Sequence, residues 1–272
     1  MTMPMNAIIV GMPRSGTSMT AAIFSRAGFY VTADEDGQLR KPDEFNPTGY
    51  WEAEPLIQAN SAIFKSAGFP HDNTWMYEPI TLAQASRIND LQRSAEHQRF
   101  VTGYNQTSPW VWKDPRLCYT LGYWWPLMNR DNTRVLLLKR DPKDIYNSFI
   151  RVKMRTPSAE DKQDTFQRIK DHMNAAEAAI RMYNIPYIEV HYSDFANDAE
   201  ATANRISSFF ELDLASHDLG FNECANNSNL RGKLGIVLDR IADHIPRNLR
   251  KTIKHTMPPI LMKYLFPYRD LS

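Results

Sequence analysis

The strongest constraint on this chain is the segment Gly11–Ser18, which lies between a short apolar run, Ala7–Val10, and a helical pattern, Met19–Ala27. A short apolar run without alternation is typical of a buried parallel strand. The segment after it carries two glycines five residues apart, followed by hydroxyl side chains, which is the frame of a phosphate-binding loop. The sequence therefore predicts a strand, an anion-binding turn and a helix in direct succession.

Thr17 occupies the position that a lysine fills in the phosphate-binding loops (P-loops) of ATP- and GTP-dependent enzymes. That lysine reaches the β- and γ-phosphates, so a loop without it is poorly equipped for a nucleoside triphosphate. The backbone N–H groups of Arg14–Thr17 still point at one place at the start of a helix, and Arg14 adds a positive charge. We expect an anion site, with a nucleotide-dependent kinase as an alternative that the absent lysine disfavours.

Strands and helices alternate along the chain, which indicates a parallel sheet. We expect an α/β fold with a central parallel sheet and helices on both faces, the three-layer sandwich of P-loop nucleotide hydrolases. Residues 1–272 are predicted to form a single domain, with a more divergent helical C-terminal region from about residue 213. Phe29–Thr32 is a possible extra strand, and Ala33–Trp51 is predicted to be a long loop. The predicted strands are Ala7–Val10, Trp110–Lys113, Arg134–Lys139 and Tyr187–Val190, and the predicted helices are Thr17–Ala27, Leu56–Ala67, Leu82–Phe100, Asp141–Arg155, Ala159–Asn184 and Asp198–Phe210.

A second anion site is predicted after the strand Arg134–Lys139. Arg140 follows this strand directly, and Asp141-Pro142 is a pair typical of a helix start. Ser148 lies two turns into that helix. Because ligands of open α/β sheets bind at the carboxyl ends of the strands, Arg140 and Ser148 could both reach an anion near the first loop. Two separate phosphate sites suggest a nucleotide with two phosphate positions.

The two segments together resemble the cofactor signatures of the sulfotransferases that use 3′-phosphoadenosine 5′-phosphosulfate. The resemblance runs in the family's order from about Ala7 to Leu212, and the region after it matches poorly. Its segments are Pro13–Ser18, Arg140–Asp144 with Ser148, Asn46–Glu52, Trp112–Leu117, and His191–Phe195 with Phe209–Leu212.

The resemblance implies an enzyme that moves a sulfuryl group from this co-substrate to a hydroxyl or amine. The first loop would hold the 5′-phosphosulfate, Arg140 and Ser148 would hold the 3′-phosphate, and Tyr192 would contact the adenine. Arg231, in a degraded form of the family's Arg-Lys-Gly run, would close over the 3′-phosphate. The loop residues that carry over from the family are Pro13, Arg14, Ser15, Gly16, Thr17 and Ser18.

The base that deprotonates the acceptor is left open by the sequence. Where many cytosolic members have a Lys-Thr-His run, this chain has Lys113-Asp114-Pro115. Other members use a glutamate, and Glu52 is the first candidate here, with Asp114 second and Glu35 third. A carboxylate can act as a base if partial burial raises its pKa toward the working pH. Lys113 is expected to steady charge on the transferring group.

The composition narrows the remaining possibilities. The net charge of +1 gives no general attraction to nucleic acid, although the stretch from residue 230 to the end is basic and could face a membrane or an acidic acceptor. No metal-ligand spacing is found among the histidines and the two cysteines, so we expect no metal and a cytoplasmic location. We expect no transmembrane segment. The acceptor could be a small molecule, a lipid or a carbohydrate, the oligomeric state stays open, and a non-catalytic nucleotide-binding relative remains an alternative.

Overall fold

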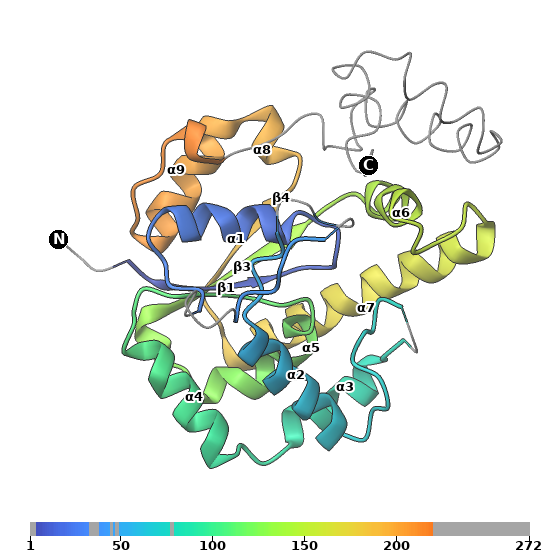
Figure 1. Cartoon of the computed structure of the whole chain (residues 1–272), viewed down its shortest axis with the longest axis horizontal. Helices are drawn as coiled ribbons and strands as arrows, with labels where there is room; N and C mark the ends of the chain where they lie inside the picture. The colour runs from blue at the N-terminus through green and yellow to red at the C-terminus, as the bar shows by residue number, and fades with distance from the viewer. Residues whose placement is uncertain (1–3, 33–37, 44–45, 47–48, 77–78, 220–272) are drawn as a thin grey trace.

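The computed structural model describes residues 4–32, 38–43, 46, 49–76 and 79–219 (Figure 1). Within them, four parallel strands form one sheet in the order β2-β1-β3-β4. Their bounds are β1 Asn6–Val10, β2 Val111–Lys113, β3 Thr133–Lys139 and β4 Tyr187–His191. The predicted parallel sheet is confirmed.

Strand register brings the two predicted anion segments together. Val10, the last residue of β1, pairs with Leu137 of β3, and Ile9 pairs with Lys113 at the end of β2. All five residues of β1 are buried, as expected of a central strand. The turns that follow β1, β2 and β3 therefore emerge side by side at the carboxyl edge of the sheet.

Helices cover both faces of the sheet (Figure 1). On one face, Ala7 and Ile9 of β1 pack in a core with α1 and α9, and on the other, Ile8 and Val10 pack in a core with α2, α4, α5 and α7. This alternation along one strand divides the apolar side chains between two layers, which confirms the predicted three-layer arrangement. The helix bounds are α1 Thr17–Arg26, α2 Glu54–Ser66, α3 Leu82–Asp90, α4 Ala95–Asn105, α5 Leu117–Trp124, α6 Pro142–Arg151, α7 Ala159–Tyr183, α8 Asp194–Asn197 and α9 Ala199–Phe210, with short 3₁₀ turns at Trp125–Leu127, Arg130–Asn132 and Ser216–Leu219.

The helix predicted over Leu82–Phe100 is wrong in its continuity. Leu91 adopts an extended conformation after α3, and the Ser94 hydroxyl accepts a hydrogen bond from the His97 amide to begin α4. A serine that satisfies a free backbone donor is a helix start, and the polar pattern of the segment concealed it. The sequence therefore holds two helices where one was predicted.

Three smaller differences concern element bounds. Phe29–Thr32 is no strand, since it contributes only a single bridge between Tyr30 and Trp110. Helix α6 begins at Pro142 after the predicted Asp141 cap, whose carboxylate accepts from the Lys143 amide at 2.7 Å, and it ends at Arg151 rather than at Arg155. Helix α5 was not predicted. The C-terminal region from about residue 213 lies mostly outside the described residues and stays a prediction.

Candidate active site

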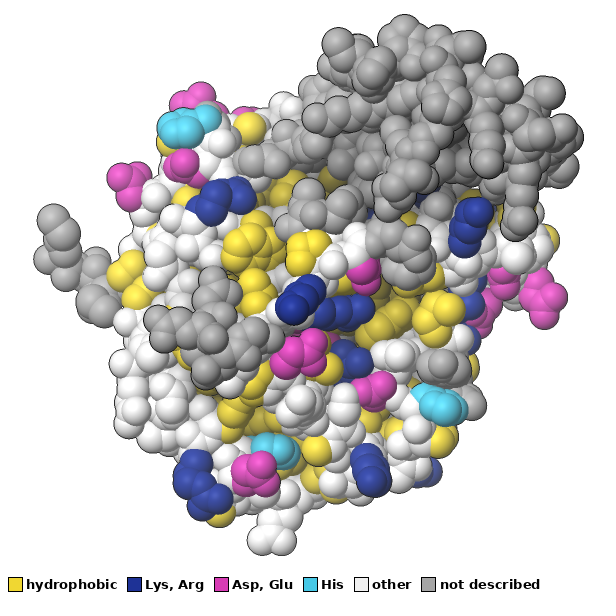
Figure 2. Space-filling model, viewed as in Figure 1, with side chains coloured by type: hydrophobic (Ala, Val, Ile, Leu, Met, Phe, Trp, Pro, Cys, Tyr) yellow, Lys and Arg dark blue, Asp and Glu magenta, His cyan; other side chains and the backbone are white. Residues whose placement is uncertain are grey.

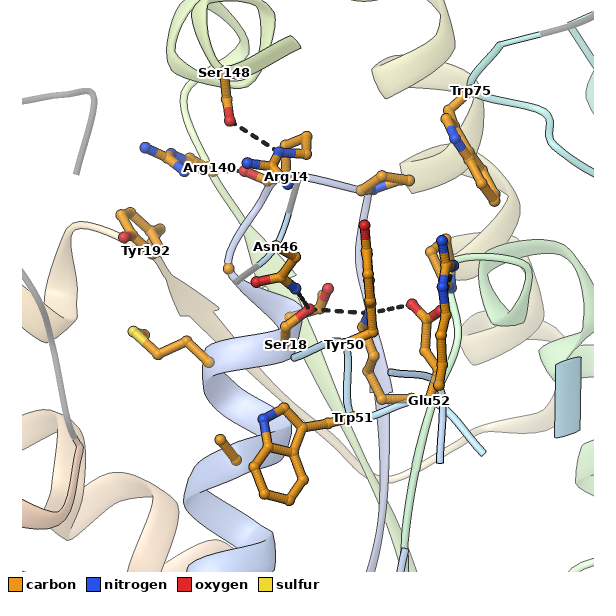
Figure 3. Close-up of a pocket in the computed structure, with 18 of the residues that line it drawn as sticks. Arg14, Ser18, Asn46, Tyr50, Trp51, Glu52, Trp75, Arg140, Ser148 and Tyr192 are labelled. Atoms are coloured by element: carbon orange, nitrogen blue, oxygen red, sulfur yellow. Dashed lines mark hydrogen bonds and ion pairs between the residues drawn. The ribbon is translucent and has the colours of Figure 1, made fainter. Parts of the chain in front are cut away.

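A cavity of about 340 Å³ lies at the carboxyl edge of the sheet. Figure 3 shows its walls, which come from the loop after β1, the first turns of α1, the ends of β2 and β3, and the segment before α2. Lysine and arginine side chains gather beside apolar ones near the centre of the face shown in Figure 2. The predicted site residues that line the cavity are Pro13, Arg14, Gly16, Thr17, Ser18, Glu52, Lys113, Arg140, Ser148 and Tyr192.

The loop after β1 has the backbone geometry of an anion cradle. Arg14 and Gly16 both have positive φ, 71° and 103°, in the left-handed region that turns successive amides to one side. Ser15 is buried and lies outside the cavity wall, because its amide and its hydroxyl both donate to the Met12 carbonyl, at 3.1 and 2.6 Å. A side chain at Gly16 would lie 2.4 Å from the Tyr192 ring. The loop is thus closed by Ser15 and leaves its open side to the start of α1.

The second predicted segment meets this loop directly. The Nε atom of Arg14 donates to Oγ of Ser148 at 3.0 Å, and Nη1 of Arg140 donates to the Arg14 carbonyl at 2.9 Å. The Arg140 guanidinium also lies 4.1 Å from the centre of the Tyr192 ring, within the range of a cation–π contact. Two arginines, a serine and a tyrosine from four separate segments therefore converge on one end of the cavity.

Glu52 and Lys113 form the other end. The Lys113 ammonium donates to Oε1 of Glu52 and, at 3.3 Å, to Oγ of Ser18, while Arg40 contacts Oε2 of Glu52 at 2.9 Å. Glu52 is 1% exposed and Lys113 is 4% exposed, so this pair is shielded from solvent. Asn46 donates to the same Ser18 hydroxyl at 3.2 Å. A carboxylate and an ammonium group therefore stand beside the phosphate-binding loop.

Asp114 lies elsewhere. It is 1% exposed, its Oδ1 accepts from Nη1 of Arg116 at 3.0 Å, and its Oδ2 accepts from Asn60 at 3.0 Å. It does not line the cavity. Of the two described carboxylates predicted as a base, the geometry favours Glu52, whereas Glu35 and Arg231 lie outside the described residues.

Several lining residues were not singled out by the sequence. Arg40 and Trp75 carried no motif of their own, and Asn46 and Tyr50 fell inside a segment noted only for its resemblance. Tyr50 donates to both carboxylate oxygens of Asp43, at 2.6 and 2.8 Å. Burial, and then this hydrogen bond, raise the pKa of Tyr50 well above its usual range, so the phenol keeps its proton.

Two searches of the part of the chain that the structure describes were negative. No group of three or more His, Cys, Asp or Glu side chains is arranged to hold a metal ion there. No helix in these ranges has the length and apolar character needed to cross a membrane.

The model of the sulfotransferase family matches residues 6–216 of this chain. The match spans the sheet, the cavity and both predicted cofactor segments. The chain belongs to the sulfotransferase family, and the predicted class of enzyme, one that transfers a sulfuryl group, is confirmed.

The similar solved structures are distant. The sulfotransferase domain from the curacin biosynthetic pathway is 14% identical, with 80% of this chain and 77% of that one covered and a TM-score of 0.48. For the sulfotransferase domain of the Synechococcus PCC 7002 olefin synthase, the values are 16%, 79%, 75% and 0.44. For sulfotransferase STF1 from Mycobacterium tuberculosis H37Rv, they are 17%, 84%, 74% and 0.45. No curated protein matches the chain.

Proposed function

We propose that the cavity binds 3′-phosphoadenosine 5′-phosphosulfate, the donor, and that the chain transfers its sulfuryl group to a hydroxyl or amine of an acceptor. The observation that carries the proposal is the bond between Arg14 and Ser148, which joins the two predicted phosphate segments in one cavity. A donor with phosphates at two positions of one ribose requires two such anchors at one site.

The donor is placed by charge and backbone. The open side of the loop, at the N-terminus of α1, and Arg14 would hold the 5′-phosphosulfate, because a helix N-terminus and a guanidinium both stabilise an anion. Arg140 and Ser148 would hold the 3′-phosphate. Tyr192, which lies beneath the Arg140 guanidinium, would contact the adenine.

The transfer is an in-line displacement at sulfur. The acceptor oxygen or nitrogen forms a bond to sulfur while the bond from sulfur to the 5′-phosphate oxygen breaks, and 3′-phosphoadenosine 5′-phosphate leaves. Glu52 takes the acceptor's proton: each of its oxygens already contacts a cation, and a carboxylate oxygen has a second lone pair. Lys113 and Arg14 offset the charge that grows on the transferring group and the leaving phosphate, so the proposal includes no metal.

Calorimetry with 3′-phosphoadenosine 5′-phosphate tests the donor site. Arg14→Ala and Arg140→Ala should each weaken binding at least about tenfold, since each removes a charge-assisted contact. Arg130→Ala, at an exposed position in the turn before β3, is the matched control and should bind normally. Unchanged affinity in both test variants would overturn the site assignment.

A transfer assay with isotopically labelled donor separates an enzyme from a binding protein. Label should pass to an acceptor in the presence of the wild-type chain. Tight binding of the desulfated nucleotide with no transfer to any acceptor would instead favour the non-catalytic alternative. A cytoplasmic location belongs to the proposal and rests on the two cysteines in unrelated contexts.

A further inference from the structure

The Glu52 end of the cavity has an apolar and aromatic wall. Tyr50, Trp75, Phe149 and Met154 line it, and Trp75 and Met154 pack in one cluster with Phe149. In the view of Figure 3, Trp75 lies on the same side of Tyr50 as Glu52, whereas Arg140 and Tyr192 lie on the opposite side. The cavity therefore has a donor arm and a second arm, which we call the acceptor arm.

The charges of the acceptor arm are already compensated. Among the lining residues that the structure describes, the one carboxylate is Glu52, and it contacts both Arg40 and Lys113. Arg14 and Arg140 lie at the donor end. A charged group buried in the acceptor arm would lose its hydration without gaining an opposite charge that is not already paired, which is unfavourable. The arm fits a neutral acceptor.

Trp75 is held in place by an unusual set of contacts to its own loop. Arg116 contacts Asp72 at 2.8 Å and donates to the Asn73 side chain at 3.0 Å. Arg168 donates to the Thr74 carbonyl at 2.8 Å, and Arg155 donates to the Trp75 carbonyl at 2.9 Å. Four consecutive residues, 72–75, are thus each contacted by an arginine from elsewhere in the chain. We call this set the arginine clamp.

The clamp is itself fixed. Arg155 and Arg168 share the carboxylate of Asp164, at 3.0 and 2.6 Å, and the Arg116 guanidinium lies 5.3 Å from the centre of the Trp75 ring. A ring held this way does not have to be ordered when a ligand arrives, which favours binding of a flat partner of fixed shape. The face of Trp75 toward the cavity is therefore a preformed wall.

We propose that the acceptor is a neutral molecule with a flat apolar body that binds against Trp75 and presents its hydroxyl to Glu52. This inference rests on the function proposed above and names the class of acceptor for that site. Trp75 is the residue that determines specificity, and Arg155 is a positioning residue that acts through it.

The test uses the full chain saturated with 3′-phosphoadenosine 5′-phosphate, so that the donor arm is filled and no turnover occurs. Calorimetry then measures the binding of three naphthalenes that share a ring system: neutral 2-naphthol, anionic 2-naphthalenesulfonate and cationic 2-naphthylmethylamine. We expect 2-naphthol to bind at least about tenfold more tightly than either charged probe, a difference of about 1.4 kcal/mol.

Substitutions at Trp75 examine the wall itself. Trp75→Ala should weaken binding of 2-naphthol about tenfold or more, whereas Trp75→Phe, which keeps an aromatic face and guards against a folding defect, should stay within about threefold of the wild type. Affinity for the desulfated nucleotide should not change in either variant. Leu82→Ala, at an exposed apolar position on α3, is the control.

Arg155→Gln examines the clamp. It should raise the KM for 2-naphthol several-fold in the transfer assay and leave kcat near that of the wild type, because a displaced wall weakens acceptor binding and not the chemical step. A merely structural role would lower the amount of active enzyme and leave KM unchanged. Arg130→Gln, outside the cavity, should alter neither value.

Two results would overturn the inference while the donor proposal stands: a nucleotide-loaded chain that does not bind 2-naphthol, or one that binds the charged probes as tightly. Unchanged affinity for 2-naphthol in Trp75→Ala would do the same. Failure of the wild-type chain to bind the nucleotide would instead overturn the proposed function, so the two failures are distinguished.

Discussion

Arg14 donates from Nε to Oγ of Ser148 at 3.0 Å and so connects residues 134 positions apart in the sequence. Ser148 is 3% exposed and lies on α6, whose first residues follow Arg140 at the end of β3. The bond therefore fixes the spacing between the loop after β1 and the start of the third strand's helix. Two anchors at a fixed spacing discriminate a nucleotide with two phosphate positions from one with phosphate at a single position.

Ser148→Ala should weaken binding of 3′-phosphoadenosine 5′-phosphate about five- to tenfold, since one hydrogen bond contributes about 1 kcal/mol and the Arg14 side chain loses an orienting partner. Calorimetry gives the affinity. Ser86→Ala, an exposed serine on α3, serves as the control. The site assignment loses its support if both variants bind alike.

Glu52→Gln should lower kcat at least about a hundredfold and leave nucleotide affinity nearly intact, because an amide fits the same space but cannot accept the proton. Single-turnover transfer of labelled sulfuryl from the donor to 2-naphthol measures the effect. Full activity in this variant would remove Glu52 from the role of base.

Asp114→Asn should act on stability. The substitution leaves the buried Arg116 guanidinium with Asp72 as its remaining carboxylate partner, and breaking a buried ion pair destabilises by about 3 kcal/mol. Thermal denaturation should show a clear decrease in Tm. A variant with wild-type Tm and wild-type nucleotide affinity but no turnover would transfer the role of base to Asp114.

The donor end of the site could be predicted because it depends on local backbone. Gly11 and Gly16 in a strand-to-helix turn, and Arg140 followed by Asp141-Pro142, each indicate a loop and a helix start from a few consecutive residues. The sheet register then brings two local features together without further information. This part of the prediction needed no knowledge of packing.

The acceptor end could not be predicted in the same way. Arg40 and Trp75 acquire their places through contacts with Glu52, Arg116 and Arg155, which are distant in the sequence. No periodic pattern marks a loop whose conformation is set by side chains from other elements. Asp114 and Glu52 both follow plausible motifs, and only tertiary packing distinguishes the residue that lines the cavity from the one that is paired with Arg116.

Gly16→Ala should abolish nucleotide binding and lower stability by about 1 to 3 kcal/mol, because alanine at a φ of 103° is strained and its Cβ would lie 2.4 Å from the Tyr192 ring. Calorimetry and thermal denaturation measure the two effects. The double variant with Tyr192→Ala removes the ring but not the backbone strain, so it should recover part of the stability at most. Full recovery would show that the clash alone, and not the left-handed turn, accounts for the glycine.

Acidification should loosen the support of the acceptor arm through His172. This side chain is fully buried on α7: its Nδ1 lies 2.7 Å from the Arg168 carbonyl, and its Nε2 lies 2.8 Å from Oγ1 of Thr74. A carbonyl only accepts, so Nδ1 carries the proton and Nε2 accepts from the Thr74 hydroxyl. Burial lowers the pKa of His172 from 6.5 to about 4, and the nearby Arg168 charge acts in the same direction.

The sign of the effect follows from where the proton binds. Between pH 6.5 and about 4 the unfolded chain protonates this histidine and the folded chain does not, so the stability that neutral His172 contributes is present above pH 6.5 and lost as the pH falls toward 4. The loss approaches about 3 kcal/mol at the acid end. Thermal denaturation of the wild type and of His172→Gln across this range should show a steeper acid loss of Tm in the wild type, and parallel curves would exclude the buried histidine as its cause.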